Sequence, residues 1–466
     1  MSVYRTDPPS LGRPFGRDYA PGAAAFAADP AVRRVVARQA AELARTSNDP
    51  EVRGRGDAIR ERVRGRWLRG DRRVDVLRGK GRDDEKALVV GGEVLVSAAS
   101  WPDVADEATR DGLTRTEVGC ADLEDRVVRL RTDGEDATTR LTRFVTDLRA
   151  QGHPVSFSYV TPLAPVMKGC SGVPAPGLAA FADYGPVDPS FGRGVRVAVI
   201  DTGIVEQSRS DGWLDGVARA PGRSPAESNL DVLDADPADG YLDVSAGHGT
   251  FVAGIIAQVA PGAEITAHRA LTTSGTATDV DVACALIRAV RENAQIVNLS
   301  LGTETYLDEP PLALAAALDV VREIEMARGW ETVIVAAGGN GGTTSPVWPA
   351  AFGRVLSVGG LTAGLKPSAW SSRGHWIDVS AVGEGVVSTY VTGAQSPDLA
   401  AEPQTFTGDA WARWSGTSFA APQVAGAVAR AMTEHSLSAT QAVDALLAAG
   451  KPVAGFGKAL QILPGA

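Results

Sequence analysis

The second half of the chain alternates short apolar runs rich in β-branched residues with longer segments of helical periodicity. The strand-like runs are 195–200, 296–300, 333–336 and 355–358, and the helix-like segments are 248–259, 279–292, 312–326 and 418–432. This alternation predicts an α/β domain with a mostly parallel sheet. In such a domain the functional site lies at the carboxyl ends of the strands.

The first half of the chain predicts smaller elements. Residues 30–69 have helical spacing, with a break at Asp49-Pro50. Further along, the pattern predicts strands at 93–97, 115–118, 126–131 and 155–160, and helices at 104–110 and 138–150. The resulting βαββαβ order is that of a split βαβ, ferredoxin-like α+β domain.

Prolines and glycines concentrate after the last of these strands, which places the main domain boundary there. We therefore expect four parts in the chain. They are a helical, Arg-rich N-terminal extension (1–87), an α+β domain (88–160), a Pro/Gly-rich linker (161–191) and the α/β domain (192–466).

The charge of the chain argues against a protein that binds polyanions as a whole, because 46 basic and 56 acidic residues give a net charge of −10. Residues 53–82 depart from this balance, with twelve Arg or Lys against four acids. This stretch could contact nucleic acid, but a solvated helix face is the favoured interpretation, since no aromatic interleaving or recognition motif accompanies the charge.

The chain shows no signal-like segment at its start and no apolar run of about 18 residues, the length that would suggest a membrane span. Cys120, Cys170 and Cys284 are scattered without CxxC spacing, which favours reduced thiols. We expect a cytoplasmic protein without a membrane partner; export by a leader outside this sequence stays an open alternative.

Candidate chemistry begins with a serine near the C-terminus. The segment Ser-Gly-Thr-Ser-Phe-Ala-Ala-Pro places Ser418 among small residues at the start of an apolar helix pattern. A helix that starts there aims free N–H groups at negative charge forming beside the hydroxyl. A hydroxyl is a weak nucleophile alone, so this site needs a base and an acid to orient the base.

Both partners are present in the sequence. Asp201 directly follows the apolar run 195–200, where its carboxylate can accept an imidazole N–H, although a turn aspartate would look the same. His248 lies between two glycines at the start of a helix pattern, which leaves its ring open to proton transfer. Asn340 follows a buried strand in a glycine-rich loop, where its NH₂ could stabilise an oxyanion together with the Ser418 N–H.

These four segments, in the order Asp, His, Asn and Ser, resemble the subtilisin-like serine protease family over about 192–466. The resemblance implies a three-layer α/β fold and a serine endopeptidase. In it, Asp201 orients the base, His248 is the base, Ser418 is the nucleophile and Asn340 stabilises the oxyanion. Two departures concern the pocket: Phe419 stands where many relatives have methionine, and Gly338 where alanine is common.

The resemblance also implies a substrate site for polypeptides. Ser300, Leu301 and Gly302 look like the strand that pairs with an extended peptide. The remaining substrate-binding candidates form the pocket floor: Ala336, Ala337 and Gly338. No charge lies in these segments, which favours an apolar or medium-sized substrate side chain over a basic one.

The α+β domain resembles the propeptides of this family, which pack on the catalytic domain and lay their C-terminal tail through the cleft as an inhibitor. Here that tail would be residues 159–169. The alternatives are a separate binding domain that never touches the cleft, and a catalytically silent scaffold that binds a protein or nucleic acid through the Arg-rich extension.

We expect no cofactor. The acidic residues between Asp201 and His248 could bind Ca²⁺, which such proteases often do, but their spacing is not that of an EF-hand loop and a plain acidic surface is favoured. These residues are Asp231, Asp234, Asp236, Asp239 and Asp243, together with the turn residue Gly240.

Overall fold

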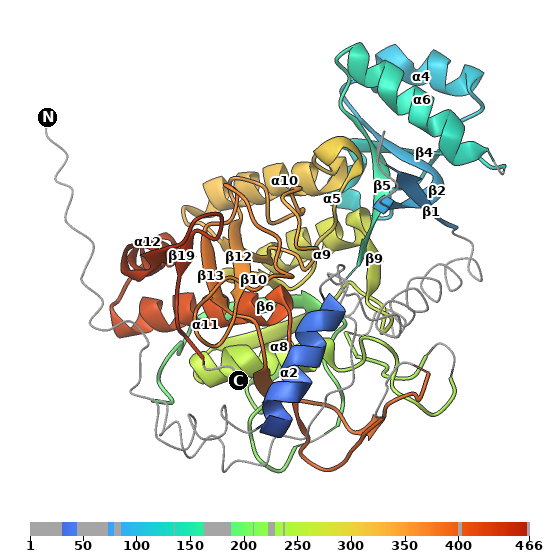
Figure 1. Cartoon of the computed structure of the whole chain (residues 1–466). Helices are drawn as coiled ribbons and strands as arrows, with labels where there is room; N and C mark the ends of the chain where they lie inside the picture. The colour runs from blue at the N-terminus through green and yellow to red at the C-terminus, as the bar shows by residue number, and fades with distance from the viewer. Residues whose placement is uncertain are drawn as a thin grey trace, which may run out of the picture.

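The computed structural model describes most of the α/β domain, the α+β domain and one helix of the N-terminal extension (Figure 1). The described residues are 30–43, 73–78, 85–134, 136–162, 188–207, 209–221, 229–235, 238–398 and 403–463. Most of the Arg-rich stretch 53–82 and of the predicted linker therefore lies outside them. In the described residues, no helix is long and apolar enough to cross a membrane.

A nine-stranded sheet forms the centre of the α/β domain. Its order is β18(Lys451–Pro452), β19(Lys458–Ala459), β13(Val379–Val382), β12(Leu356–Leu361), β11(Val333–Ala337), β10(Ile296–Leu299), β6(Arg196–Asp201), β8(Glu264–Arg269) and β7(Val217–Arg219). Neighbours pair in parallel throughout, except for β18 with β19. The predicted mostly parallel sheet is confirmed.

Helices cover both faces of this sheet, because side chains on a strand alternate between faces. On β6, Val197 and Val199 join a core shared with α8(His248–Val259), α11(Thr417–Glu434) and α12(Ala439–Ala449). Ala198 and Ile200 join the other core, against α9(Asp279–Arg291) and α10(Leu312–Arg328). The domain thus has three layers, with α8 and α11 buried side by side on one face.

Shorter elements complete the α/β domain. They are the antiparallel pair β14(Val386–Thr389) and β17(Trp411–Trp414), the pair β15(Gly393–Ala394) and β16(Thr405–Phe406), and the 3₁₀ turn η2(Tyr306–Asp308).

The α+β domain stands above α9 and α10 in Figure 1. Along the chain it comprises β1(Val74–Arg78), β2(Glu85–Ser97), α4(Trp101–Arg110), β3(Thr114–Thr116), α5(Ala121–Glu124), β4(Val127–Arg131), α6(Ala137–Ala150) and β5(Val155–Pro162). The antiparallel order β3-β4-β2-β5 contains the predicted βαββαβ arrangement. Strand β1 pairs with the start of β2, so the sheet begins at Val74 and not at the expected boundary after residue 87.

The two domains are joined by a strand pair and by a shared core. Strand β5 pairs antiparallel with β9(Thr276–Thr278), the short strand that leads into α9. Four apolar side chains of the α+β domain pack in the core of the α/β domain beneath α9 and α10: Leu95, Val118, Leu123 and Val127. The α+β domain therefore packs against the α/β domain through buried apolar side chains.

Helix α2(Pro30–Leu43) of the N-terminal extension lies across the front of the α/β domain in Figure 1. Its buried positions Val32, Val36 and Gln39 follow each other at spacings of four and three, which is one face of a helix. The Gln39 amide donates to the Arg413 carbonyl (3.0 Å) and accepts from the Ser415 hydroxyl (2.6 Å). The extension thus contacts the chain three residues before Ser418.

Candidate active site

Asp201 and His248 meet at the carboxyl end of β6. Asp201 is the last residue of β6 and His248 is the first residue of α8. The His248 ring nitrogen Nδ1 lies 2.7 Å from Asp201 Oδ1, and both side chains are fully buried. The carboxylate also accepts the Thr202 backbone N–H at 2.7 Å. This arrangement holds the ring with Nε2 free to handle a proton.

Two aromatic rings flank the His248 ring. Trp414 meets it edge to face with centroids 5.4 Å apart, and the Phe419 ring lies at 5.2 Å. His248 Nε2 is buried and has no hydrogen-bond partner among the described residues. An apolar surround of this kind excludes water from a proton-transferring nitrogen.

Ser418 lies in the first turn of α11 and its hydroxyl donates to the Ser300 carbonyl at 3.0 Å. The Ser300 hydroxyl in turn donates to the Ser418 carbonyl at 2.7 Å. This orientation differs from the serine-to-histidine hydrogen bond that proton transfer requires. The Ser418 side chain must rotate from Ser300 toward His248 Nε2 to react, and catalytic hydrogen bonds often tighten only with substrate bound.

The orientation of the Asn340 amide follows from its partners. Asn340 Oδ1 accepts from the Thr417 backbone N–H (2.9 Å) and from the Thr417 hydroxyl (2.8 Å). The Thr417 hydroxyl itself accepts the Gly339 N–H at 3.1 Å. Because both contacts on Oδ1 are donors, that atom must be the oxygen, and Nδ2 is left as a buried donor without a partner among the described residues. Such a donor beside Ser418 suits an oxyanion.

The predicted substrate-binding residues lie near these groups, but three of their side chains belong to the cores. Leu301 and Ala336 pack in the core beneath α9 and α10, and Ala337 packs in the core on the opposite face. These three residues can therefore offer only backbone to a substrate. Gly302 and Gly338 are closely surrounded as well: an added Cβ would lie 2.6 Å from Val347 and 2.7 Å from Ile377.

The acidic loop before His248 uses its described carboxylates as hydrogen-bond acceptors for backbone N–H groups. Asp234 accepts from Asp239 and Gly240, and Asp243 accepts from Ala235. Asp236 lies outside the described residues. Within the described residues, no group of three or more potential ligands could hold a metal ion. Calcium binding stays an untested alternative.

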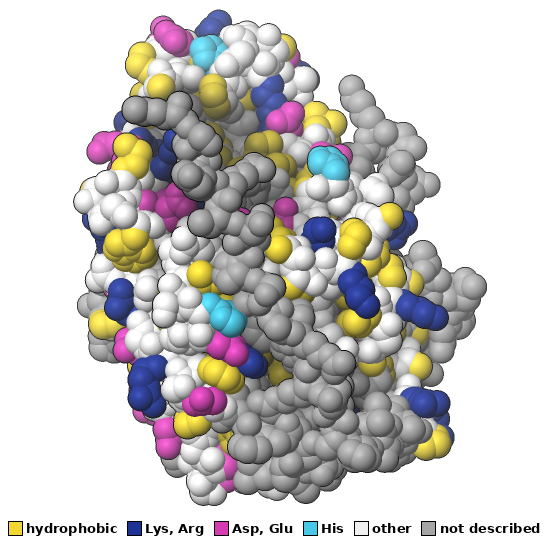
Figure 2. Space-filling view, turned by 90° about the vertical axis from the view of Figure 1, so that its left-hand side faces the viewer, with side chains coloured by type: hydrophobic (Ala, Val, Ile, Leu, Met, Phe, Trp, Pro, Cys, Tyr) yellow, Lys and Arg dark blue, Asp and Glu magenta, His cyan; other side chains and the backbone are white. Residues whose placement is uncertain are grey.

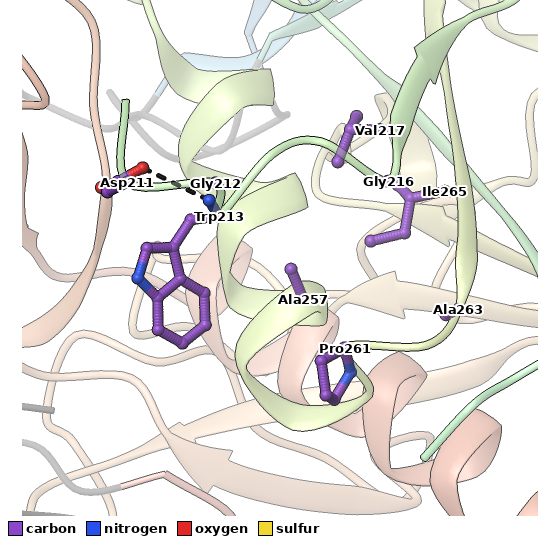
Figure 3. A pocket seen from close by; sticks show the side chains of 9 residues that line it. All are labelled: Asp211, Gly212, Trp213, Gly216, Val217, Ala257, Pro261, Ala263 and Ile265. Atoms are coloured by element: carbon purple, nitrogen blue, oxygen red, sulfur yellow. Dashed lines mark hydrogen bonds between the residues drawn. The ribbon is translucent and has the colours of Figure 1, made fainter. Parts of the chain in front are cut away.

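A hollow of about 250 Å³ lies elsewhere on the domain (Figure 3). Its lining includes Trp213, Val217, Ala257 and Pro261. Ala257 follows His248 by nine residues on α8, which is about 13 Å along a helix axis. This hollow is therefore separate from the residues that carry the chemistry.

The sequence of the α/β domain matches the model of the Subtilase family over residues 192–451. The chain belongs to this family. The subtilase match includes all four of Asp201, His248, Asn340 and Ser418, whose catalytic roles stay predictions supported by the geometry above.

Curated relatives of this subtilase are proteases. The chain is 30% identical over 276 residues to a "Thermophilic serine proteinase" of Bacillus sp. (strain AK1), which covers 57% of this chain and 59% of the relative. It is also 30% identical to "Thermitase" of Thermoactinomyces vulgaris over 58% of this chain and 86% of that protein. The chain thus spans less than two thirds of the first relative's length.

Among solved structures, fervidolysin from Fervidobacterium pennivorans, a keratinolytic enzyme related to subtilisin, has a similar fold. The TM-score is 0.55 at 21% identity, covering 84% of this chain and 62% of fervidolysin. This coverage is larger than the family match, so the likeness in fold extends beyond residues 192–451.

The motifs alone did not indicate two of the groups that shape the site. Trp414 beside His248 and Thr417 on Asn340 lie next to the serine motif, yet nothing in their spacing assigns them these contacts. An aromatic residue four positions before the nucleophile was the available signal for Trp414.

Proposed function

We propose that this subtilase is a serine endopeptidase that hydrolyses peptide bonds through Asp201, His248 and Ser418. The observation that carries the proposal is the buried 2.7 Å contact between His248 Nδ1, at the N-terminus of α8, and Asp201 Oδ1, at the end of β6. Ser418 lies in the first turn of α11. The names of the curated relatives support the same activity.

In the proposed reaction the Ser418 hydroxyl attacks a peptide carbonyl while His248 Nε2 takes its proton. The negative charge that forms on the carbonyl oxygen is stabilised by Asn340 Nδ2 and the Ser418 N–H. His248 then gives the proton to the leaving amine, which leaves an acyl-enzyme. Water, deprotonated by His248, hydrolyses this ester and restores Ser418.

The substrate is a polypeptide bound in extended form by strand addition, in which main-chain hydrogen bonds supply most of the recognition. Ser300 and Gly302 offer backbone on one side. The preference for an apolar or medium-sized side chain at the cleaved bond rests on the absence of charge in segments 300–302 and 336–338.

We further propose that the α+β domain restrains this activity, as an intramolecular inhibitor. The contacts of its last strand, β5, support this proposal. Val160 pairs with Thr278 of β9 on one side, and its carbonyl accepts the Thr303 hydroxyl at 3.2 Å on the other. Thr303 directly follows Gly302, so the end of β5 lies beside the segment that we expect to bind an extended peptide, which supports the proposal. The remainder of the predicted tail, 163–169, lies outside the described residues.

Ion pairs and hydrogen bonds reinforce this docking. Arg126 forms a bidentate pair with Glu323 of α10 (2.7 and 2.9 Å), and Asp122 pairs with Arg291 of α9. The Tyr159 hydroxyl accepts the Tyr306 N–H at 3.3 Å. Exposed pairs of this kind add little each, so the shared apolar core supplies most of the docking energy.

The experiment that tests the activity is hydrolysis of a labelled casein or short peptide by the purified full chain. Wild type and Ser418→Ala are compared, with Ser438→Ala as a matched control on the N-cap of α12, away from the site. We expect activity in wild type and Ser438→Ala and none in Ser418→Ala. Cleavage by Ser418→Ala, free of contaminating protease, would remove the assignment of the nucleophile.

The scaffold alternative relies on the Arg-rich stretch, most of which lies outside the described residues. On the face shown in Figure 2, basic and acidic side chains of the described residues are interspersed and do not form a broad basic area. This distribution does not favour nucleic acid as a partner of that face.

A further inference from the structure

Asp231 is a buried carboxylate in the loop between Asp201 and His248. Its side chain is 2% exposed. The preceding residue, Leu230, forms a β-bridge with Ile204 in the turn after β6. From the sequence, we expect Asp231 to be a surface carboxylate or a ligand of Ca²⁺. In the structure it accepts hydrogen bonds from within the protein.

The carboxylate of Asp231 connects the segments that carry the catalytic acid and base. Asp231 Oδ2 accepts the Thr202 hydroxyl at 2.9 Å and the Gly247 N–H at 2.8 Å. Thr202 is the residue after Asp201, and Gly247 is the residue before His248. One oxygen atom therefore holds both segments at once.

The Thr202 hydroxyl donates its one proton to Asp231 Oδ2. It already accepts the Gly249 N–H at 3.1 Å, on the far side of His248. Asp231 Oδ2 is thus the acceptor in both contacts, from the Thr202 hydroxyl and from the Gly247 N–H. Together with the Asp201 to His248 contact, these bonds close a ring around the catalytic pair.

The backbone segments that carry Asp201 and His248 are in direct contact. A Cβ on Gly249 would lie 2.1 Å from the Gly203 carbonyl oxygen, and Gly247 has φ +76°, with Tyr390 and Val391 at 2.8 Å from an added Cβ. Contact alone keeps the two segments close, but it does not fix their direction. The hydrogen bonds of Asp231 supply that direction.

Placing a second carboxylate here reduces stability. Burial raises the pKa of Asp231 to about 6, and the nearby Asp201 carboxylate acts in the same direction. A residue that only filled space would avoid this penalty. Groups that carry such a penalty beside catalytic residues are candidates for a functional role.

We propose that Asp231 is a positioning residue, which holds Asp201 and His248 in register through Thr202 and Gly247 without touching the substrate. This inference rests on the proposed peptidase function. Without the Asp231 carboxylate, Asp201 and His248 are no longer held in one geometry, and misplacement by about 1 Å can lower the rate of hydrolysis roughly 10²-fold.

The test compares full-length Asp231→Ala, Asp231→Asn and Asp243→Asn with wild type and Ser418→Ala. Asp243 is the matched control, because its buried carboxylate accepts the Ala235 N–H within the same loop. The measurements are kcat and KM for a short peptide, the rate of labelling by a fluorophosphonate, the melting temperature and the low-field proton resonance of the His248 ring N–H. Labelling of wild type but not of Ser418→Ala establishes the peptidase site in the same experiment.

We expect Asp231→Ala to lower kcat and the labelling rate by about 10²-fold at unchanged KM, and to shift the His248 resonance. Asp231→Asn keeps an oxygen for Thr202 and Gly247 and should retain within about tenfold of the wild-type rate. Asp243→Asn should change the melting temperature only. Wild-type kcat and an unmoved resonance in Asp231→Ala would overturn the proposal.

A second variant covers failure of Asp231→Ala to fold. Thr202→Val removes the hydroxyl that Asp231 accepts and so opens the ring from its other end. The same loss of kcat without a change in KM is expected. A Thr202→Val protein with wild-type kcat and an unmoved His248 resonance would count against the proposal.

Discussion

Truncation of Leu123 should release the active site from its N-terminal domain. Leu123 lies on α5 of the α+β domain, is fully buried, and packs in the core of the α/β domain with residues of α9 and α10. Its side chain packs among side chains of both domains, and its contacts with α9 and α10 exist only while the domains are docked. Leu123→Ala should therefore leave a larger cavity in the closed state than in the open one.

The magnitude follows from that geometry. A buried Leu→Ala change costs about 2–5 kcal/mol, including the cavity. Since each 1.4 kcal/mol is a factor of ten, the ratio of open to closed molecules rises roughly 30- to 4,000-fold. While the open form is rare, the rate of peptide hydrolysis is proportional to its population. The rate should thus rise by that factor until most molecules are open.

The assay is the initial rate of hydrolysis of a short fluorogenic peptide by the intact full chain at low temperature. Leu148→Ala is the control, because Leu148 is equally buried but lies on α6 in the α+β domain's own core. With both variants folded by circular dichroism, only Leu123→Ala should be faster than wild type. Equal rates in wild type and Leu123→Ala, despite a lower melting temperature, would refute inhibition by docking.

Four other perturbations have definite expected outcomes. Asn340→Ala should fold and lower kcat by about 10²–10³, a magnitude that comes from subtilisin itself, as measured by steady-state kinetics. Burial, and to a lesser extent the Glu93 carboxylate, raises the pKa of Asp279, whose carboxylate accepts the Tyr159 N–H of β5. Asp279 therefore gains a proton when the domains dock, and inhibition should weaken as pH rises. The ratio of wild-type to Asp279→Asn rates should accordingly increase with pH, and a constant ratio would contradict this. Gln39→Ala removes the hydrogen bonds of Gln39 to Arg413 and Ser415, so it should lower the free energy of unfolding by about 1–3 kcal/mol, as measured by denaturant titration. Excess chelator should leave the melting curve unchanged; a lower melting temperature would restore the calcium hypothesis.

The order of the elements and the residues of the site could be predicted from sequence, because each rests on local signals. β6 reads as a buried strand in isolation, and Asp201 must follow it. Glycines around His248 and the helix pattern after Ser418 likewise place their side chains without knowledge of the rest of the fold. The parallel sheet then brings these carboxyl ends together.

Contacts between distant segments could not be predicted in the same way. Strand β9 has three residues, too few for periodicity, and it is a strand only because β5 lies beside it. Gln39 and Ser415 are 376 residues apart. Asp231 looks like its acidic neighbours in the sequence, and only the fold shows that its carboxylate is buried. The Ser418 hydroxyl direction is a rotamer choice that no pattern carries.

The central claim is that Asp201, His248 and Ser418 work as one catalytic unit. The most direct measurement is mass spectrometry of the full chain after reaction with a fluorophosphonate, with the modified peptide sequenced. Our account predicts one adduct, on Ser418, that is absent in Ser418→Ala and strongly reduced in His248→Ala. An adduct on another serine, or undiminished labelling of the His248→Ala protein, would contradict it.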